Sequence, residues 1–346
     1  LAALLYTSGT TGRSKGAMLS HRNLASNAKV LHRYWGFRSG DVLLHMLPIF
    51  HVHGLFVATH CSLMNGSPMF FEPKFDAKRA LALLPRATVF MGVPTYYVRL
   101  LADQGFTREL CSNMRLFISG SAPLLMETFE EFKTRTGYTI LERYGMTEGN
   151  MFTSNPYDGE RRGGTGGFPL PGVSIRIADA ENQPAEIGEI GQIEVKGDNI
   201  FRGYWRMPEK TSEEFTADGF FKTGDMGKRD KDGYISIIGR SKDLIISGGL
   251  NVYPKEIEEM IDAMPGVFES AVFGVPHPDF GEAVVAAVVR QKNPNGAAAT
   301  ETSIIHALKG ALANFKAPKR VHFIDELPRN SMGKVQKNIL RQQFAG

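Results

Sequence analysis

The first 140 residues alternate between short apolar runs and longer amphipathic stretches. The apolar runs LAALLYT (1–7), ATVFMGVP (87–94) and MRLFISGSA (114–122) predict β-strands. Amphipathic stretches follow them: Ser20 is expected to cap a helix through Tyr34, TYYVRLLADQG (95–105) predicts a second helix, and LLMETFEEFKTRTG (124–137) predicts a third that ends at Gly137. This repetition predicts an α/β domain with a mainly parallel sheet.

Beyond about residue 170 the pattern changes twice. The short alternating runs VSIRIAD (173–179), GEIGQIEVKG (188–197) and GYISIIGR (233–240) predict a small antiparallel β-subdomain. After Arg240, expected helices at 255–266 and 303–315 and strands at 267–276, 281–290 and 320–327 predict an α+β unit large enough for its own core. We therefore predict a large domain over 1–241 and a small, mobile C-terminal domain over 242–346.

Composition adds mainly exclusions. No apolar run approaches roughly 18 residues, so neither a membrane span nor a membrane partner is expected. The net charge of +4 has no basic block behind it, which gives no reason to expect a nucleic-acid partner. Cys61 and Cys111 lie far apart without clustered histidines, so we expect buried apolar thiols and a cytoplasmic protein. The chain opens inside an expected strand without Met, and we expect the first part of the large domain to be missing.

The segment YTSGTTGRSKG (6–16) has the composition of a phosphate-binding loop. Its glycines, hydroxyl side chains and Lys15 follow an expected strand and supply N–H, O–H and ammonium donors. The Walker pattern needs Gly-Lys-Ser/Thr, whereas Gly12 is followed by Arg-Ser-Lys-Gly, so a P-loop kinase is disfavoured. A glycine-rich turn without a ligand is the alternative.

The same segment resembles the phosphate-loop signature of the adenylate-forming superfamily, which contains acyl- and aryl-CoA synthetases, adenylation domains and firefly-type luciferases. The resemblance continues in the same order through YGMTE (144–148), TGD (223–225), GRSKDLIISGGLNVYP (239–254) and PRNSMGKVQK (328–337). It implies that a carboxylate attacks the α-phosphate of ATP, after which the C-terminal domain rotates and the thiol of coenzyme A displaces AMP. Family members carry a long segment before the phosphate loop that this chain lacks.

The resemblance also implies roles for residues. Lys334 would bridge the carboxylate and the α-phosphate, Thr147 would bind the α-phosphate and Glu148 would hold Mg²⁺. The implied ATP- and AMP-binding set is Thr7, Ser8, Gly9, Thr10, Thr11, Gly12, Lys15, Ser119, Gly120, Ser121, Ala122, Pro123, Glu142, Tyr144, Gly145, Met146, Asp225 and Arg240. The plainer alternatives are a solvated Lys334 and an Asp225 that only closes a turn.

Other positions match the family's moving parts. Lys242 corresponds to the hinge, and Gly248, Gly249 and Leu250 would line the channel for coenzyme A. The segment PIFHVHG (48–54) corresponds to the wall of the acyl pocket, where we favour His51 over His53 as the residue that gates thiol access. A metal pair formed by these two histidines is the alternative.

Two arginines bear on which acid is activated. Arg99 and Arg143 occupy positions that resemble those of the malonyl-CoA synthetases, where paired guanidinium groups hold the distal carboxylate of malonate. The alternatives are an ion pair of Arg99 with Asp103 and one of Arg143 with Glu142 or Glu148.

The sequence thus predicts a malonate–CoA ligase. A CoA ligase for another small acid such as methylmalonate, an adenylation domain that loads a carrier protein, or a nucleotide-binding fragment without turnover are the alternatives. Because the role of Lys334 needs its positive charge, a lysine acetyltransferase that modified it would stop adenylation.

Overall fold

The computed structural model describes residues 1–7, 15–179, 181–330 and 333–344. Two compact units share the chain. The larger contains Leu1–Thr223 and Lys228–Ile237, and the smaller contains Gly224–Gly227 and Ile238–Gly346.

In the larger unit the strands are β1 Ala3–Thr7, β2 Lys15–Leu19, β3 Leu43–His45, β4 Met69–Phe71, β5 Val89–Gly92, β6 Leu116–Ser119, β7 Leu141–Met146, β8 Asn150–Ser154, β9 Phe168–Pro169, β10 Val173–Ala178, β11 Gly191–Gly197 and β12 Phe221–Arg229, whose Gly224–Gly227 falls in the smaller unit. Strand β13 Ile235–Arg240 likewise runs from the larger unit into the smaller. The helices are α1 His21–Tyr34, η1 His53–Ala58, α2 Thr59–Met64, α3 Ala77–Leu83, η2 Leu84–Arg86, α4 Pro94–Leu101, α5 Met126–Thr136 and α6 Pro208–Glu213.

The smaller unit continues with η3 Ser241–Asp243, β14 Ile245–Ser247, β15 Leu250–Val252, α7 Pro254–Asp262, β16 Val267–His277, β17 Gly281–Arg290, η4 Pro294–Ala298, α8 Glu301–Ala311, β18 Arg320–Phe323 and α9 Lys337–Phe344.

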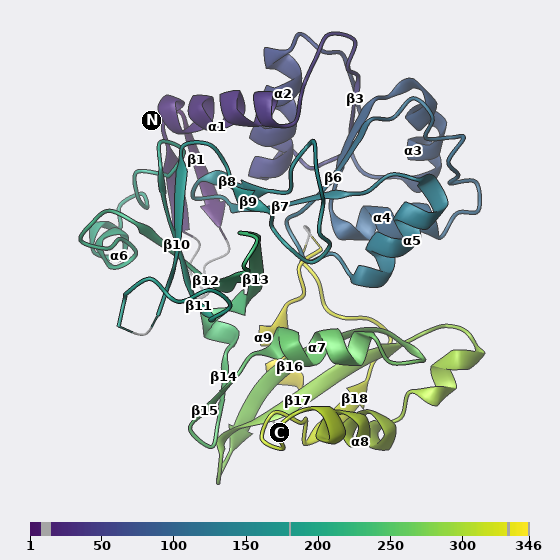
Figure 1. Cartoon of the computed structure of the whole chain (residues 1–346), viewed down its shortest axis with the longest axis vertical. Coiled ribbons are helices and arrows are strands. Elements are labelled where there is room, and N and C mark those ends of the chain that lie inside the picture. Colours follow the sequence, from purple (N-terminus) through teal and green to yellow (C-terminus); the bar gives the residue numbers. More distant parts are fainter. Residues whose placement is uncertain (8–14, 180, 331–332, 345–346) are drawn as a thin grey trace. The chain divides into compact units, whose positions relative to one another are not determined.

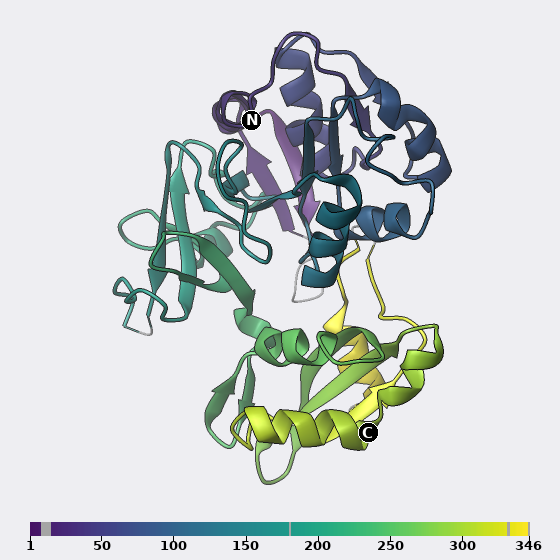
Figure 2. The ribbon, with the colours of Figure 1, turned by 45° about the vertical axis from the view of Figure 1, so that its right-hand side comes forward.

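The main sheet of the larger unit has the strand order β4-β3-β5-β6-β7-β8-β9. The pairs from β4 through β7 are parallel, and β8 and β9 join antiparallel. Helices α3, α4 and α5 pack their apolar faces on β3, β5 and β6, around Phe90, Tyr97, Phe117 and Phe132. Figures 1 and 2 show α1 and α2 on the other side of these strands. The parallel α/β domain predicted from the alternating pattern is confirmed.

Local signals in the sequence account for the helix ends. Ser20 caps α1 by accepting a hydrogen bond from Asn23 N–H in a capping box, as its position predicts. Gly137 ends α5 with a left-handed backbone (φ +77°), which glycine adopts without steric cost. Cys61 and Cys111 are both buried free thiols, and burial raises the pKa of Cys111 to about 12.

The antiparallel subdomain has the order β10-β11-β12-β13, which confirms the second predicted pattern. Strand β7, in contrast, has no counterpart in the predicted elements. Its inner residues are polar, with Glu142 and Arg143 both buried, so the hydrophobic pattern gave no strand signal there. This unpredicted strand carries much of the candidate site.

In the smaller unit the order is β15-β14-β17-β16, with β18 parallel to β17. Helices α7 and α8 share a core with one face of this sheet, through Ile257, Ile261, Ile304 and Leu308. Helix α9 packs on the other face through Leu340. The predicted α+β unit is confirmed. No helix among the described residues is long and apolar enough to cross a membrane.

Candidate active site

The candidate site of the larger unit begins where strands β6 and β7 end side by side. Ser119 pairs with Glu142 in parallel register, which brings the segment after β6 next to Arg143. The carboxyl edge of parallel strands is where α/β sheets place ligands. Two segments separated in the sequence, 119–123 and 142–148, therefore meet at one edge.

Arg143 is buried there, and two of its nitrogens are unpaired in the part of the chain that the structure describes. It is 5% exposed, and its Nε and Nη2 atoms have no hydrogen-bond partner among the described residues. Its guanidinium lies over Gly120, where a Cβ atom would come within 2.3 Å of Nη1. Burial lowers the pKa of Arg143 to about 9, opposed by the neighbouring Tyr97. The Nε and Nη2 atoms of Arg143 therefore make no hydrogen bond to Glu142 or Glu148.

A histidine lies beside this arginine, and it is His53. The side chain of His53 is fully buried, and its Nε2 atom has no partner in the described part of the chain. Its Nδ1 atom is 3.3 Å from the Ser121 hydroxyl, and Ser121 is held at φ +73°, an uncommon conformation for a non-glycine residue. Burial, and then the charge of Arg143, keep the pKa of His53 well below its ordinary value, so the ring is neutral.

His51 occupies a different position. It is half-buried, and its Nδ1 atom accepts the N–H of His53 at 3.1 Å. His53 begins a π-helical segment, η1, an element that often marks functional positions and that the sequence did not signal. No group of metal-ligating side chains large enough to hold an ion is present among the described residues, so the pair of histidines gains no third ligand.

Arg99 lies on α4 with its side chain exposed, two positions beyond the buried Tyr97. Two residues correspond to about 200° of helix rotation, so Arg99 and Tyr97 face opposite ways. Arg99 forms neither an ion pair with Asp103 nor a contact with Arg143 in the described structure. The two arginines that the sequence placed together are thus one buried and one exposed.

On the nucleotide side, a tyrosine connects two predicted residues. Tyr204 donates its hydroxyl to Glu148 Oε1 at 2.8 Å and accepts from Lys15 Nζ at 3.3 Å. Lys15 also lies 4.3 Å above the Tyr204 ring and 3.7 Å from Glu214. Glu148 is buried. Sequence reasoning missed Tyr204, which no motif flanks and which is distant from both partners along the chain.

The other nucleotide residues take varied positions. Ser119 is buried with its hydroxyl unpaired among the described residues, whereas Thr7, Ala122, Tyr144 and Thr147 are half-buried. Tyr144 lies edge-on to Phe152, with the ring centres 5.6 Å apart. Gly145 and Met146 are half-buried, and Pro123 is exposed. Ser8, Gly9, Thr10, Thr11 and Gly12 lie outside the described residues.

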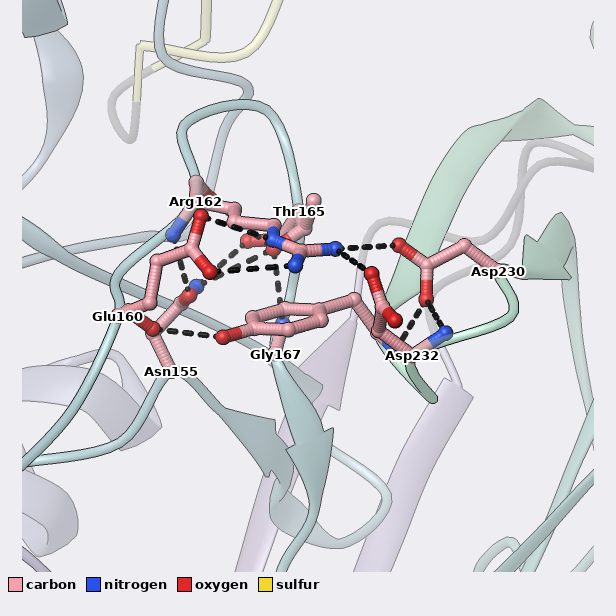
Figure 3. Close-up of polar contacts among 8 residues, drawn as sticks. Asn155, Glu160, Arg162, Thr165, Gly167, Asp230 and Asp232 are labelled. Atoms are coloured by element: carbon pink, nitrogen blue, oxygen red, sulfur yellow. Dashed lines mark hydrogen bonds and ion pairs between the residues drawn. The ribbon is translucent and has the colours of Figure 1, made fainter.

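A polar network surrounds Arg162 in the loop 155–167 (Figure 3). Arg162 pairs with Glu160, Asp230 and Asp232 at 2.9–3.1 Å, which fastens the loop 155–167 to the β12–β13 turn. The same loop holds Glu142: the Gly164 N–H donates to Glu142 Oε1 at 2.8 Å, and the Asn155 amide donates to the Glu142 carbonyl. The neighbour of Arg143 is thereby fixed from both its side chain and its backbone.

The smaller unit contains the remaining predicted residues. Arg240 Nε lies 2.8 Å from the buried Asp225 Oδ1, so the two residues assigned to the ribose are in contact. Lys242 is exposed on η3. Gly248 and Gly249, at φ +60° and +77°, form the two-residue turn between β14 and β15, a turn type that needs positive φ at both positions. Leu250, which follows, is exposed.

Lys334 lies where residues 333–336 pair back on residues 328–330, and we call these two paired segments the hairpin. Its N–H donates to the Asn330 side chain at 3.0 Å, and its carbonyl accepts the Asn330 N–H at 2.9 Å. Gln336 N–H donates to the Pro328 carbonyl at 2.8 Å, and Arg329 pairs with Val335. The Lys334 side chain is half-buried.

A parallel sheet followed by an antiparallel subdomain and a separate α+β unit is the fold of the adenylate-forming enzymes. The chain belongs to the AMP-binding enzyme family: that family model matches residues 1–205, and the model of the AMP-binding enzyme C-terminal domain matches residues 256–334.

Individual relatives are similar throughout the chain. ATP-bound MatB from Rhodopseudomonas palustris is 61% identical with a TM-score of 0.97, covering 100% of this chain and 68% of that one. A malonyl-CoA ligase in complex with methylmalonyl-CoA and AMP is 40% identical with a TM-score of 0.66, over 94% and 71% of the two chains. A malonate–CoA ligase of Arabidopsis thaliana is 39% identical over 99% of this chain and 60% of its own length. The chain spans about 60% of the length of such curated relatives.

Proposed function

We propose that the protein is an ATP-dependent malonate–CoA ligase. In the first step a malonate oxygen attacks the α-phosphorus of ATP, which forms malonyl-adenylate and releases pyrophosphate. In the second, the sulfur of coenzyme A attacks the acyl carbon, AMP leaves, and the thiol proton passes to solvent. The names of the similar ligases support the acid, and ATP in the MatB complex supports the nucleotide.

One observation carries the choice of a diacid: the Nε and Nη2 atoms of the buried Arg143 guanidinium have no hydrogen-bond partner among the described residues. A buried polar group left unpaired costs roughly 1–3 kcal/mol, and a charged group costs more. A carboxylate that accepted from Nε and Nη2 would remove this cost, because the guanidinium edge matches a carboxylate bidentately. A fatty acid or a simple aromatic acid offers no such group.

His53 adds a neutral donor to the same pocket. If the Ser121 hydroxyl donates to Nδ1, the proton of the ring stays on Nε2, the buried atom without a partner. The Nε2–H group could then donate to the distal carboxylate beside Arg143. We therefore assign the acyl-pocket role to His53 in preference to His51. Arg99 is the proposed second arm of the clamp, and it would have to turn inward from its exposed position.

The nucleotide side follows from Glu148. A buried carboxylate with a tyrosine donor on one oxygen suits a hard cation shared with phosphate oxygens, so Glu148 would hold Mg²⁺. Bound there, Mg²⁺ would neutralise charge on the phosphates. Lys15 and Thr147 would bind phosphate oxygens, Asp225 and Arg240 the ribose, and Tyr144 the adenine. Tyr204 would orient Glu148 and Lys15 together.

Lys334 would stabilise the charge that moves between the carboxylate and the α-phosphate in the first step. We propose that the domain 242–346 rotates about Lys242 between the two steps, and that Gly248, Gly249 and Leu250 then line the path of coenzyme A. Acetylation of Lys334 by a lysine acetyltransferase would block the first step by removing the charge. A cytoplasmic location is part of the same proposal.

The second candidate is a ligase for methylmalonate or another short diacid. A similar malonyl-CoA ligase forms a product complex with methylmalonyl-CoA and AMP, and this supports methylmalonate as a second candidate acid. An Arg143 clamp would serve either acid, because the extra methyl group lies on the carbon between the two carboxylates.

An acid panel tests the proposal. Thioester formation is measured with malonate, methylmalonate, propionate and butyrate for the wild-type protein and for Arg143→Met and Arg99→Met, which remove the two proposed arms of the clamp one at a time. Removing one partner of a buried charge contact costs about 2–5 kcal/mol, so Arg143→Met should lower kcat/KM for malonate by roughly 30-fold or more. ATP affinity should stay unchanged. An unchanged malonate kcat/KM in Arg143→Met would contradict the clamp.

A further inference from the structure

The hairpin that carries Lys334 is fastened to the edge of the small unit's sheet. Backbone hydrogen bonds join residues 328–330 to residues 333–336, and these bonds stay within the hairpin. Val335 packs against the apolar cluster that contains Phe273 and Leu340. Two cations that flank Lys334, Arg329 on one side and Lys337 on the other, add ionic attachments. Each pairs with a carboxylate near the free edge of β16.

The first attachment is Arg329 to Glu269. Arg329 Nη2 donates to Glu269 on β16, and Arg329 Nη1 donates to the Gly333 carbonyl at 2.6 Å. One guanidinium therefore joins the strand to the residue directly before Lys334. Its planar fork fixes the direction of both bonds, which a flexible ammonium would not do.

The second attachment is Lys337 to Glu258. Lys337 Nζ lies 2.6 Å from Glu258 Oε1, and both side chains are less than a fifth exposed. The same oxygen accepts the Val272 N–H of β16 at 2.7 Å. Glu258 is thus held by the strand edge before it contacts Lys337, so it is a preorganised acceptor and not a mobile surface group.

A third carboxylate completes the group. Asp262 lies one helical turn beyond Glu258 on α7, and its Oδ1 atom is buried without a hydrogen-bond partner among the described residues. Burial, together with Glu258 and Glu269, raises the pKa of Asp262 to about 7. The cluster is not a metal site, because no ion-binding group of acidic or histidine side chains occurs in the described part of the chain. Its charge is met by Arg329 and Lys337.

We infer that Glu258 and Glu269 are positioning residues for adenylation: they hold the hairpin so that the Lys334 ammonium keeps a fixed place relative to the small unit. Neither touches a reacting atom; they act through Lys337 and Arg329. This inference rests on the proposed role of Lys334 in the first step. It predicts that the two half-reactions respond differently when the attachments are broken.

The test measures the two half-reactions separately on purified full-length protein. Malonate-dependent ATP–pyrophosphate exchange reports adenylation, and transfer from pre-made malonyl-adenylate to coenzyme A reports thioester formation. Displacement of a reacting group by about 1 Å can cost on the order of a hundredfold, so Glu258→Gln and Glu269→Gln should each slow adenylation about ten- to a hundredfold. Thioester formation should change by less than about threefold, because Lys334 takes no part in it.

The matched control is Glu256→Gln. Glu256 lies on the same helix and pairs with Lys316 at 2.8 Å, away from the hairpin. This variant should keep both half-reactions while losing a comparable amount of thermal stability. The double variant Glu258→Lys/Lys337→Glu exchanges the two charges. It should catalyse adenylation faster than Glu258→Lys alone, and a general loss of stability would not produce this recovery.

The outcomes separate the two levels of inference. Equal loss of both half-reactions in Glu258→Gln and Glu269→Gln, or no loss in either, would overturn the positioning role while leaving the ligase intact. Wild-type protein that forms neither malonyl-adenylate nor thioester would overturn the proposed function itself.

Discussion

The pocket around Arg143 and the hairpin around Lys334 differ in whether their cations are paired with carboxylates. Arg143 is buried and lacks a partner on two of its nitrogens in the described structure. The cations beside Lys334 are less buried, and each has a carboxylate within contact distance. An unpaired buried charge is costly to keep, so its persistence points to a ligand that completes it. A cation paired with a carboxylate fixes the position of the chain around it, and we infer that Arg329 and Lys337 do this for Lys334.

The largest effect is expected when the positive charge of Lys334 is removed. Lys334→Gln should lower the rate of malonate-dependent ATP–pyrophosphate exchange by about 10²–10³-fold, because a preorganised donor to the charge that develops in the transition state is lost. Transfer from pre-made malonyl-adenylate should stay within a few-fold of wild type. Equal losses in the two assays would show that Lys334 serves both steps or only the fold.

Gly120→Ala tests the pocket by displacing the guanidinium of Arg143. A Cβ atom would lie 2.3 Å from Arg143 Nη1, so the guanidinium must move although the fold need not. We expect kcat/KM for malonate to fall roughly ten- to a hundredfold with ATP affinity retained. Gly310→Ala is the control, since an added Cβ meets nothing within 4 Å on α8. If Gly120→Ala kept full malonate activity, the position of the guanidinium would not matter for the acid.

Arg143→Met tests whether the unpaired cation destabilises the protein without malonate. We expect the free energy of unfolding to rise by about 1–3 kcal/mol, because a buried group without hydrogen bonds is replaced by an apolar one. Wild type at a malonate concentration of a hundred Kd should gain about 2.7 kcal/mol, and the variant should gain none. Thermal unfolding with and without malonate measures both. A less stable variant would mean that Arg143 is already satisfied.

The last prediction concerns Asp262, in the paired region, and involves no loss of activity. Its folded pKa of about 7 lies above its unfolded value, so the native state holds the proton more tightly than the unfolded state. Its stabilising share is full at low pH and is lost as pH rises from about 4 through 7. Asp262→Asn should therefore be nearly as stable as wild type at pH 4 and more stable at pH 8, by at most about 4 kcal/mol for a shift of about three pKa units. A pH-independent difference would contradict the raised pKa.

Much of the fold was predictable because its signals are local. Ser20 and Gly137 mark helix ends by their own chemistry, and the change from helical to alternating periodicity separates the α/β sheet from the antiparallel subdomain. Strand β7 and the π-helical segment at His53 were not predictable in this way. The first is a buried polar strand, and the second differs from an α-helix only in its hydrogen bonding.

The residues of the candidate site also divide into those that a motif predicts and those that no motif predicts. The motifs placed Lys15, Glu148, Asp225, Arg240 and Lys334 among the site residues, since residue type and spacing carry that information. Tyr204, which joins Lys15 to Glu148, could not be found because it belongs to no motif and is distant in sequence from both. The sequence favoured His51 over His53, whereas folding buries His53, because a motif does not say which of its two histidines the tertiary structure covers.

The sequence by itself determined the family, the order of the units and the residue types of the chemistry, because these depend on local pattern and on motifs. Only the tertiary structure decided three things. Arg143 is buried with two nitrogens unpaired in the described structure while Arg99 is exposed, His53 lies beside Arg143, and Glu258 and Glu269 pair with the cations that flank Lys334. Burial and pairing depend on which distant segments meet, and no local pattern in the chain encodes that meeting.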